Sequence, residues 1–473
     1  MIDQMSLTQQ AKAIRDGSLT STVLTKHYLS TIRKHNPSIN AIVQMREESV
    51  ILDEANQADK EAAHGKFRGP LHGVPITIKD VLHVKGYRLS RGIAEFMGEA
   101  SLEDATVVER LRNAGAIILG LTNVPELCMA FETENLIYGR TNNPYDQTKS
   151  AGGSSGGEAA AIAAGMSPAG LASDASGSVR VPAHFNGICS LKLTQGRVPL
   201  TGQFPRERSG LFHHTSNFGV MGRYIDDLEI LGQLISGPDH KDPDTVNVPW
   251  ISDNVNLPMC KAAFLYQTST VSPSKPVKEA LDSIRSILSS SILSTTEEAP
   301  PMFEEASEIM WRLFITGGDG AKGWKQLLSS INKHICTPQL EGLIRMSEDV
   351  KLNAEQMKID WENLDRFRYH LARFFRNYDF LITPVHPTTA FPHGNSLNNR
   401  HDYDYVFPFS ISGSPVVVIR AGFDPDTQLP IGIQIIAAKW QEAKLLVLAR
   451  FLEKRLQPWT PVFKSSELKK NSI

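Results

Sequence analysis

Two clusters of small hydroxyl residues set in glycine occupy the middle of the chain. The first is SAGGSSGG at residues 150–157, and the second is SDASGSVRVPA at residues 173–183. The apolar run AAAIAA at residues 159–164 separates them, which is not what a flexible Gly/Ser linker contains. Glycine lets a backbone approach a ligand closely, and serine supplies a potential nucleophile. The two clusters therefore predict a backbone-lined pocket for an oxygen anion, with hydroxyls aimed into it.

Helical and strand-like segments alternate around these clusters. Helical spacing recurs at residues 6–35, 51–64, 105–113, 158–165 and 442–456, and apolar strand-like runs stand at residues 70–82, 116–120, 169–172, 378–384, 415–419 and 430–436. The sequence TNVPE at residues 122–126 is expected to open another helix, since proline suits a first turn. The repeated helix-then-strand order predicts an α/β sheet.

Residues 236–375 differ in character from the rest of the chain. They begin with a loop-like stretch of charges and prolines, and residues 276–293 and 351–375 then show amphipathic helical patterns. No chemical motif is found here. The segment is therefore interpreted as a helical cap or a substrate-selecting insertion.

Composition excludes several classes of function. The formal net charge of −2 gives no reason to expect nucleic acid or an anionic membrane surface as a partner. No apolar stretch is long enough to span a bilayer, and the first residues lack the pattern of a signal peptide. The four cysteines lie far apart, which predicts reduced thiols in a cytoplasmic protein, and no cluster has metal-ligand spacing. They are Cys128, Cys189, Cys260 and Cys336.

A lysine stands at the end of the strand-like run GVPITIKD at residues 73–80. By alternation, Ile76 and Ile78 face one side, while Thr77 and Lys79 face the other. Lys79 could reach solvent along its alkyl chain. It could instead lie in a dry site, where desolvation lowers its pKa and makes it a base. This stretch alone leaves both interpretations open.

The first serine cluster also matches the G-x-S-x-G pattern of α/β-hydrolase esterases. In that fold the pattern connects a strand to a helix and is followed by an acidic residue and a histidine. Here NNPYD at residues 142–146 is a turn rather than a strand, and His386, His393 and His401 have no distinguishing setting. This esterase interpretation is the less favoured one. A P-loop is excluded because no Gly-Lys-Ser/Thr ends the run.

Four motifs taken together resemble the amidase signature family. They are the runs at residues 73–80, 122–126, 152–157 and 174–183, and they occur in the family's order and spacing. The resemblance is dense over about 65–230, returns within 378–456, and is thin between 236 and 375. It implies a single large α/β/α domain over residues 1–473, with a mixed central β-sheet covered by helices.

The resemblance implies a Ser–cis-Ser–Lys triad without a metal or cofactor. Ser178 would be the nucleophile, Ser154 the bridging serine on a cis peptide, and Lys79 the base. A serine hydroxyl needs an adjacent base, and lysine serves as one only when it is neutral. Asp80 lies on the opposite face of the strand, so it need not keep Lys79 charged.

Further residues carry over from the same resemblance. The backbone N–H groups of Ala175, Ser176, Gly177 and Ser178 would form an oxyanion hole. Cys128 matches a position that lines the acyl pocket, although a plain packing role is equally open to it. Asp174 and Arg180 look like structural partners of the loop. The chain departs from the family pattern at Ser176, where glycine is usual, at Leu121, where lysine is common, and at Ala151, where proline is common.

The expected function is hydrolysis of a small-molecule amide to a carboxylate and ammonia or an amine, through a serine acyl-enzyme. One alternative is the amidase component of a glutamyl-tRNA amidotransferase, which works with a partner subunit. Those relatives usually carry aspartate where Pro125 stands, so the free-standing enzyme is favoured. A catalytically silent scaffold is a third interpretation, against which the intact triad argues. The resemblance also leaves a homodimer open, since many relatives are dimers.

Overall fold

The structure is a computed structural model that describes residues 2–204, 210–251, 255–291 and 294–463. Within this part of the chain, a mixed sheet of 11 strands has the order β1-β3-β2-β6-β8-β7-β12-β13-β11-β9-β10. Its strands are β1 Ile42–Gln44, β2 Pro75–Lys79, β3 Ile117–Thr122, β6 Ala169–Asp174, β7 Cys189–Lys192, β8 Asn217–Gly222, β9 Lys261–Phe264, β10 Ser294–Glu297, β11 Phe380–Pro384, β12 Val416–Phe423 and β13 Pro430–Ile436. A separate hairpin pairs β4 Glu134–Asn135 with β5 Gly139–Arg140. The expected α/β fold with a mixed central sheet is confirmed.

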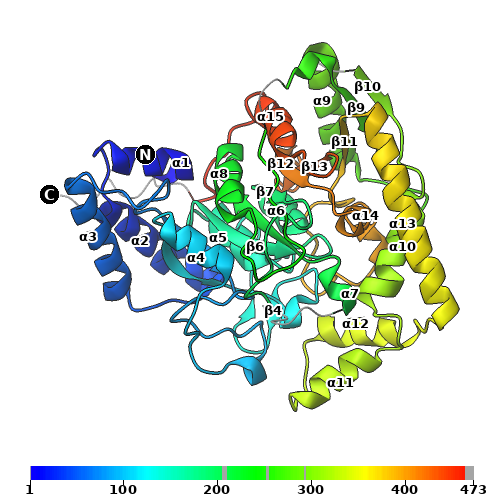
Figure 1. Cartoon of the computed structure of the whole chain (residues 1–473), viewed down its shortest axis with the longest axis horizontal. Helices are drawn as coiled ribbons and strands as arrows, with labels where there is room; N and C mark the ends of the chain where they lie inside the picture. Colours follow the sequence, from blue (N-terminus) through cyan, green and yellow to red (C-terminus); the bar gives the residue numbers. More distant parts are fainter. Residues whose placement is uncertain (1, 205–209, 252–254, 292–293, 464–473) are drawn as a thin grey trace.

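Helices surround the sheet along its whole length (Figure 1). They are α1 Leu7–Arg15, α2 Ser21–Ile39, α3 Glu48–Ala63, α4 Thr106–Asn113, α5 Gly156–Ala163, α6 Arg180–Asn186, α7 Gly210–His213, α8 Ile225–Ile235, α9 Lys275–Ser291, α10 Phe303–Ile309, α11 Lys322–Ser330, α12 Pro338–Glu348, α13 Ala354–Asn377, α14 Phe407–Ile411 and α15 Glu442–Glu453. A π-helical stretch, η5 Met310–Ile315, continues α10.

Both faces of the sheet are buried under hydrophobic side chains. Along β12, Val417 and Ile419 belong to one buried cluster, whereas Val416 and Val418 belong to a second. Successive strand residues point to opposite faces, so the two clusters are the cores of two layers that sandwich the sheet. This explains why β2, β3 and β6 are apolar or small at nearly every position rather than alternating with solvent-facing residues.

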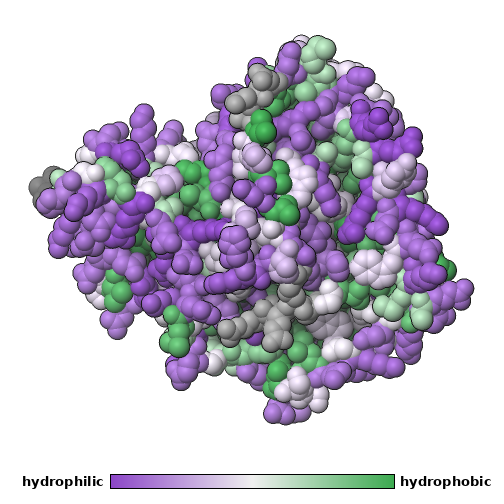
Figure 2. Space-filling model, viewed as in Figure 1, coloured by the Kyte–Doolittle hydropathy of each residue, from purple (hydrophilic) through white to green (hydrophobic). Residues whose placement is uncertain are grey.

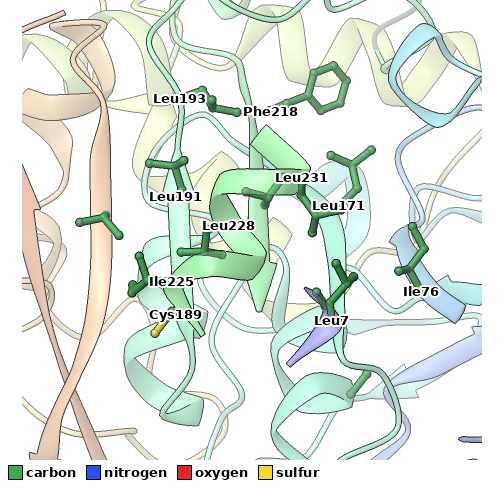
Figure 3. Packing of buried hydrophobic residues seen from close by; sticks show 14 of the residues in the cluster. Leu7, Ile76, Leu171, Cys189, Leu191, Leu193, Phe218, Ile225, Leu228 and Leu231 are labelled. Atoms are coloured by element: carbon green, nitrogen blue, oxygen red, sulfur yellow. The ribbon is translucent and has the colours of Figure 1, made fainter. Parts of the chain in front are cut away.

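Helix α8 shows how one of these layers forms. Its residues Ile225, Leu228 and Leu231 recur at helical spacing and are buried. Figure 3 shows them beside Leu171 of β6 and Leu191 of β7. Their stripe therefore lies over the central strands β7 and β8 and also packs against Leu171 of β6, the strand that leads into the second serine cluster.

Parallel pairing brings the two halves of the predicted site together. Strand β2 lies between β3 and β6 and is parallel to both. The carboxyl ends of parallel strands meet at the same edge of a sheet. Lys79 at the end of β2 therefore lies close to Ser173 and Asp174 at the end of β6, although the sequence separates them widely.

Three local expectations differ from the structure. Residues 122–126 do not open a full helix: η3 Glu126–Cys128 is a single 3₁₀ turn, with Leu127 and Cys128 at positive φ. The 236–375 segment is not purely helical, because its strands β9 and β10 extend the central sheet beyond β11. Helix α2 continues past Pro37 to Ile39. A capping box of Ser6 and Gln9 begins α1.

Polar residues cover most of the face seen in Figure 2, with hydrophobic residues in small scattered groups. No helix in the described ranges has the length and apolar character needed to cross a bilayer.

Candidate active site

Lys79 occupies a dry position at the carboxyl end of β2. Its side chain is completely buried. The Nζ atom donates to Ser154 Oγ at 2.7 Å, to Ser173 Oγ at 3.1 Å and to the Ser173 carbonyl at 3.3 Å. Burial lowers the pKa of Lys79, and the neighbouring Cys128, Asp174 and Glu158 oppose that shift only in part. The interpretation in which this lysine reaches solvent is therefore wrong.

The first serine cluster forms a tight loop in front of helix α5. The peptide bond between Gly153 and Ser154 is cis, and Gly152 has a φ of 76°. A Cβ atom on Gly153 would lie 2.6 Å from the Ala130 carbonyl oxygen, so only glycine fits there. This close packing holds Ser154 against Lys79, with the hydroxyl of Ser154 buried.

The second serine cluster is a loop built around a buried ion pair. Asp174 accepts hydrogen bonds from the N–H groups of Gly177 at 2.8 Å and Val179 at 3.1 Å. Arg180 donates to both carboxylate oxygens of Asp174, at 2.9 and 3.0 Å. Burial alone would raise the pKa of Asp174, but the charge and hydrogen bonds of Arg180 hold it well below its usual range. The charged carboxylate thus fixes the curve of the loop that carries Ser178.

Ser178 faces the same pocket as Ser154, and both serines are buried. The N–H group of Ser155 donates to the Ser178 carbonyl at 3.1 Å, which ties the two loops together. Within the described part of the chain, the hydrogen bonds from Lys79 extend to Ser154 but not to the Ser178 hydroxyl. The structure therefore places Ser154 and Ser178 in one pocket and joins Lys79 directly to Ser154.

The loop also presents backbone donors to the pocket. Ala175, Ser176 and Ser178 line it, and their N–H groups have no hydrogen-bond partner among the described residues. Gly177 differs from the expectation, because its N–H group donates to Asp174. Three of the four amides are thus left without a protein acceptor among the described residues. Gly177 serves the loop through its φ of 115°, which other residues rarely adopt.

Cys128 lines the same pocket as the serines, and its thiol interacts with Ser154. It is half-buried and has a φ of 60°. Burial raises the pKa of its thiol, and the charge of Lys79 opposes this. A neutral thiol at this position adds an apolar wall to the pocket rather than a charge.

Two adjoining chambers make up the site. The inner chamber, which holds Ser154 and Ser178, has a volume of about 30 Å³, close to that of one water molecule. The outer chamber has a volume of about 500 Å³. The two share the lining residues Leu127, Met129, Phe204, Phe212, Phe314 and Ile315. A ligand that reaches the serines therefore passes between apolar and aromatic side chains.

Residues of α7, η5 and α11 line the outer chamber. Leu211, Leu313, Trp324 and Leu327 complete its apolar wall. Asp319 also lines the chamber, but its carboxylate accepts hydrogen bonds from the N–H groups of Lys322 and Gly323 and so caps α11. The 236–375 segment thus contributes much of this wall, through η5 and α11.

A buried carboxylate, that of Glu126, connects the turn η3 to the segment between α11 and α12. Glu126, next to Leu127, accepts hydrogen bonds from the N–H and hydroxyl groups of Thr337, at 2.7 and 3.0 Å. Its other oxygen lies 2.9 Å from Lys333 Nζ. Thr337 and Lys333 stand between α11 and α12, so this carboxylate ties the outer wall to the turn that carries Cys128.

Sequence reasoning missed Ser173, Glu126 and Lys333 as parts of the site. Ser173 stands beside the predicted Asp174, so its place at the end of the same strand was the available signal. Glu126 belongs to a motif in the sequence, but no role is predicted for it there. Lys333 lies in a segment without motifs, and only the folded chain brings it to Glu126. Among the described residues, no group of three or more His, Cys, Asp and Glu side chains is placed to hold a metal ion.

Known proteins match this chain over nearly its whole length. The family model described as Amidase matches residues 23–446. Human fatty-acid amide hydrolase 2 is 31% identical, with 96% of this chain and 90% of that protein covered. A glutamyl-tRNA(Gln) amidotransferase subunit from Chloroflexus aurantiacus is 30% identical, with 97% of this chain and 98% of that protein covered.

A solved structure of fatty acid amide hydrolase has the same fold. It superposes with a TM-score of 0.86 at 23% sequence identity, covering 98% of this chain and 86% of that one.

Proposed function

The chain belongs to the amidase signature family, and on that premise we propose that it hydrolyses a small, largely apolar amide with Ser178 as nucleophile, Ser154 as proton relay and Lys79 as base. The observation that carries these roles is the 2.7 Å contact from Lys79 Nζ to Ser154 Oγ, in a dry site that also contains Ser178. Because burial lowers the pKa of Lys79, this amine is neutral in a larger fraction of the protein molecules near physiological pH than a solvent-exposed lysine would be.

In the first half of the reaction, Lys79 takes the proton of Ser154 while Ser154 takes the proton of Ser178. The Ser178 oxygen then attacks the amide carbon, and the carbonyl oxygen becomes an anion. In this proposal the N–H groups of Ala175, Ser176 and Ser178, three residues that line the pocket, donate to that anion. Loss of one such donor typically lowers the rate by about a hundredfold or more.

In the second half, the charged Lys79 returns its proton through Ser154 to the leaving nitrogen. The carbon–nitrogen bond breaks, and ammonia or an amine departs. Water then attacks the ester on Ser178, and the same relay accepts its proton. The relay returns this proton to the Ser178 oxygen as the ester bond breaks, and the acid product loses its own proton to solvent and leaves as a carboxylate.

The proposed substrate class follows from the outer chamber. Its volume of about 500 Å³ lies in the usual range for small-molecule sites, and its wall is apolar and aromatic. The relative named fatty-acid amide hydrolase 2 is consistent with an apolar acyl group. A panel of purified amides tests this proposal: an arylalkyl or long-chain amide should be cleaved with a higher kcat/KM than acetamide. Equal values for both would contradict it.

The same assay tests the alternative that the chain is a component of an amidotransferase. The similarity to the amidotransferase subunit from Chloroflexus aurantiacus supports that alternative. We expect the purified single chain to release ammonia or an amine without a partner. Release only after addition of a second subunit would favour the alternative.

We expect kcat/KM to rise with pH and then reach a plateau. Below the lowered pKa of Lys79 the amine is charged and cannot accept a proton, whereas above it the amine is neutral. The measurement is kcat/KM for an uncharged amide from mildly acidic to alkaline pH, with chemistry rate-limiting. A flat profile over that range would count against a lysine base.

We expect Lys333→Met, which removes the cation beside Glu126, to raise KM several-fold for a bulky apolar amide. We expect the same variant to change kcat/KM for acetamide little. The reason is that Glu126 loses its cation, so the outer wall loosens while the serines keep their contacts. Steady-state kinetics with both substrates measure this split. Lys325→Met on α11 removes only an exposed ion pair with Glu348 and serves as the control, with no change expected. Equal effects on both substrates would contradict a role in the outer chamber.

A further inference from the structure

A second ionisable group lies buried behind Lys79. Glu158 stands in the first turn of α5, and its side chain is completely buried. The Thr77 hydroxyl donates to its Oε1, and the Thr122 hydroxyl donates to its Oε2 at 2.9 Å. In the described part of the chain, no lysine or arginine forms an ion pair with it. Two hydroxyls are weak support for a buried carboxylate charge.

The sheet leaves a space for this carboxyl group. Gly170 of β6 pairs with Thr77 of β2, and a Cβ atom on Gly170 would lie 1.9 Å from Glu158 Oε1. Any larger residue at position 170 would displace the carboxyl. The absence of a side chain at Gly170 thus lets the Glu158 carboxyl lie directly against β2.

The position of Thr77 places this carboxyl near the lysine. Thr77 and Lys79 lie on the same face of β2, and two residues of a strand span about 6.6 Å. Burial raises the pKa of Glu158 to about 7, and the hydrogen bonds from Thr77 and Thr122 and then the charge of Lys79 oppose this. The Glu158 charge in turn raises the pKa of Lys79. The two groups therefore interact across a region without water.

Two other ionisable groups face Lys79 from other elements. Asp174, at the end of β6, stays charged because Arg180 holds its pKa low. Cys128, in the turn after β3, stays neutral because burial raises the pKa of its thiol. Asp80 lies on the opposite face of the strand and accepts hydrogen bonds from Ser90. Burial raises the pKa of Asp80 to about 6, but the charge of Asp80 does not shift the pKa of Lys79. Glu158 is thus the described group whose charge both acts on Lys79 and changes near neutral pH.

We propose that Glu158 sets the pH at which Lys79 gives up its proton, so that the carboxyl and the amine titrate as one buried pair. Glu158 is then a positioning residue that acts through the charge of Lys79 and does not touch substrate. This inference rests on the proposed function of Lys79 as the base. Apparent pKa values measured for activity belong to such a pair rather than to either residue.

The sign of the effect follows from the charges. An ionised Glu158 stabilises the charged form of Lys79 and so keeps the base protonated to higher pH. Glu158→Gln removes that charge while keeping an oxygen for the threonine hydroxyls. The rising limb of kcat/KM should therefore move to lower pH. A unit charge about 7 Å away at an effective dielectric constant of about 20 shifts a pKa by roughly one to two units.

The experiment compares pH profiles of kcat/KM for an uncharged p-nitroanilide in the wild type, Glu158→Gln, Thr122→Val and Asp227→Asn. We expect Glu158→Gln to shift the limb down by about one unit or more. Thr122→Val keeps the carboxyl but removes one donor, which makes the carboxylate harder to ionise, so we expect a smaller shift in the same direction. Asp227, a buried carboxyl on α8, is the matched control and should leave the limb in place.

Each outcome decides between the proposals. Suppose the wild-type profile has a rising limb, and neither Glu158→Gln nor Thr122→Val moves it. That result overturns the role of Glu158 and leaves Lys79 as the base. If Glu158→Gln does not fold, the shift in Thr122→Val decides alone. A wild-type profile without a rising limb overturns the lysine base itself, and this inference with it. A shift in Asp227→Asn as large as that in Glu158→Gln would also overturn it.

Discussion

Ser178→Ala is expected to lower kcat by on the order of 10⁴-fold or more while the protein keeps its fold. The proposed reaction passes through an ester on this oxygen, and alanine offers no atom to attack the amide carbon. The hydroxyl makes no hydrogen bond to the described residues that folding would lose, and the backbone contact from Ser155 remains. The free energy of unfolding should therefore change by less than about 1 kcal/mol.

The matched control is Ser155→Ala. Ser155 is buried in the first serine cluster, next to Ser154, and its hydroxyl donates to the Ser173 carbonyl at 3.3 Å. We expect this variant to keep most of its activity and to react with a serine-directed fluorophosphonate, as the wild type does. Intact mass should show one adduct in the wild type and in Ser155→Ala, and none in Ser178→Ala. Labelling of Ser178→Ala would mean that another serine is the nucleophile.

The core of the site was predictable because its residues lie in local motifs. The glycines around Ser154 and the run from Ser173 to Arg180 carry their geometry in their own sequence, through positive φ at Gly177 and close backbone packing at Gly153. Lys79 was harder to place. Its strand permitted a solvent-facing lysine, and only the parallel pairing of β2 with β6 brings the side chain to Ser154.

The supporting residues were not predictable from local pattern. Glu158 occupies the first turn of a helix, where an acidic residue needs no further explanation. Its role depends on the space at Gly170, which is a property of strand pairing. Lys333 pairs with Glu126, which lies far away in the sequence, and no local sequence pattern indicates this contact. Likewise, β9 joins the sheet by pairing with β11, a strand distant in sequence, and β10 pairs with β9. The local pattern of the 236–375 segment showed only a loop-like stretch and amphipathic helices, so these two strands were not expected.

Arg180→Met is expected to lower the free energy of unfolding by about 3–5 kcal/mol, because it leaves the Asp174 carboxylate buried without its cation. Arg180 is completely buried and donates to four acceptors: both Asp174 oxygens, the Val406 carbonyl at 2.8 Å and the Ser410 hydroxyl at 2.8 Å. Methionine keeps most of the volume but none of these bonds. Urea denaturation of the wild type and the variant at neutral pH measures the difference, and kcat should fall with it because the amides of the Ser178 loop lose their anchor.

The pH dependence and a double variant separate charge from packing. In the wild type Arg180 holds the pKa of Asp174 low, so this carboxylate stabilises the fold above its unfolded pKa and loses that contribution as pH falls through its folded pKa. In Arg180→Met burial raises the pKa of Asp174 instead, so the carboxyl takes up a proton on mild acidification and the deficit relative to wild type should shrink. Adding Asp174→Asn removes the unpaired charge and should recover part of the lost stability at neutral pH. If the double variant is less stable than Arg180→Met by the full cost of a second, independent substitution, the loop is held by packing and not by this ion pair.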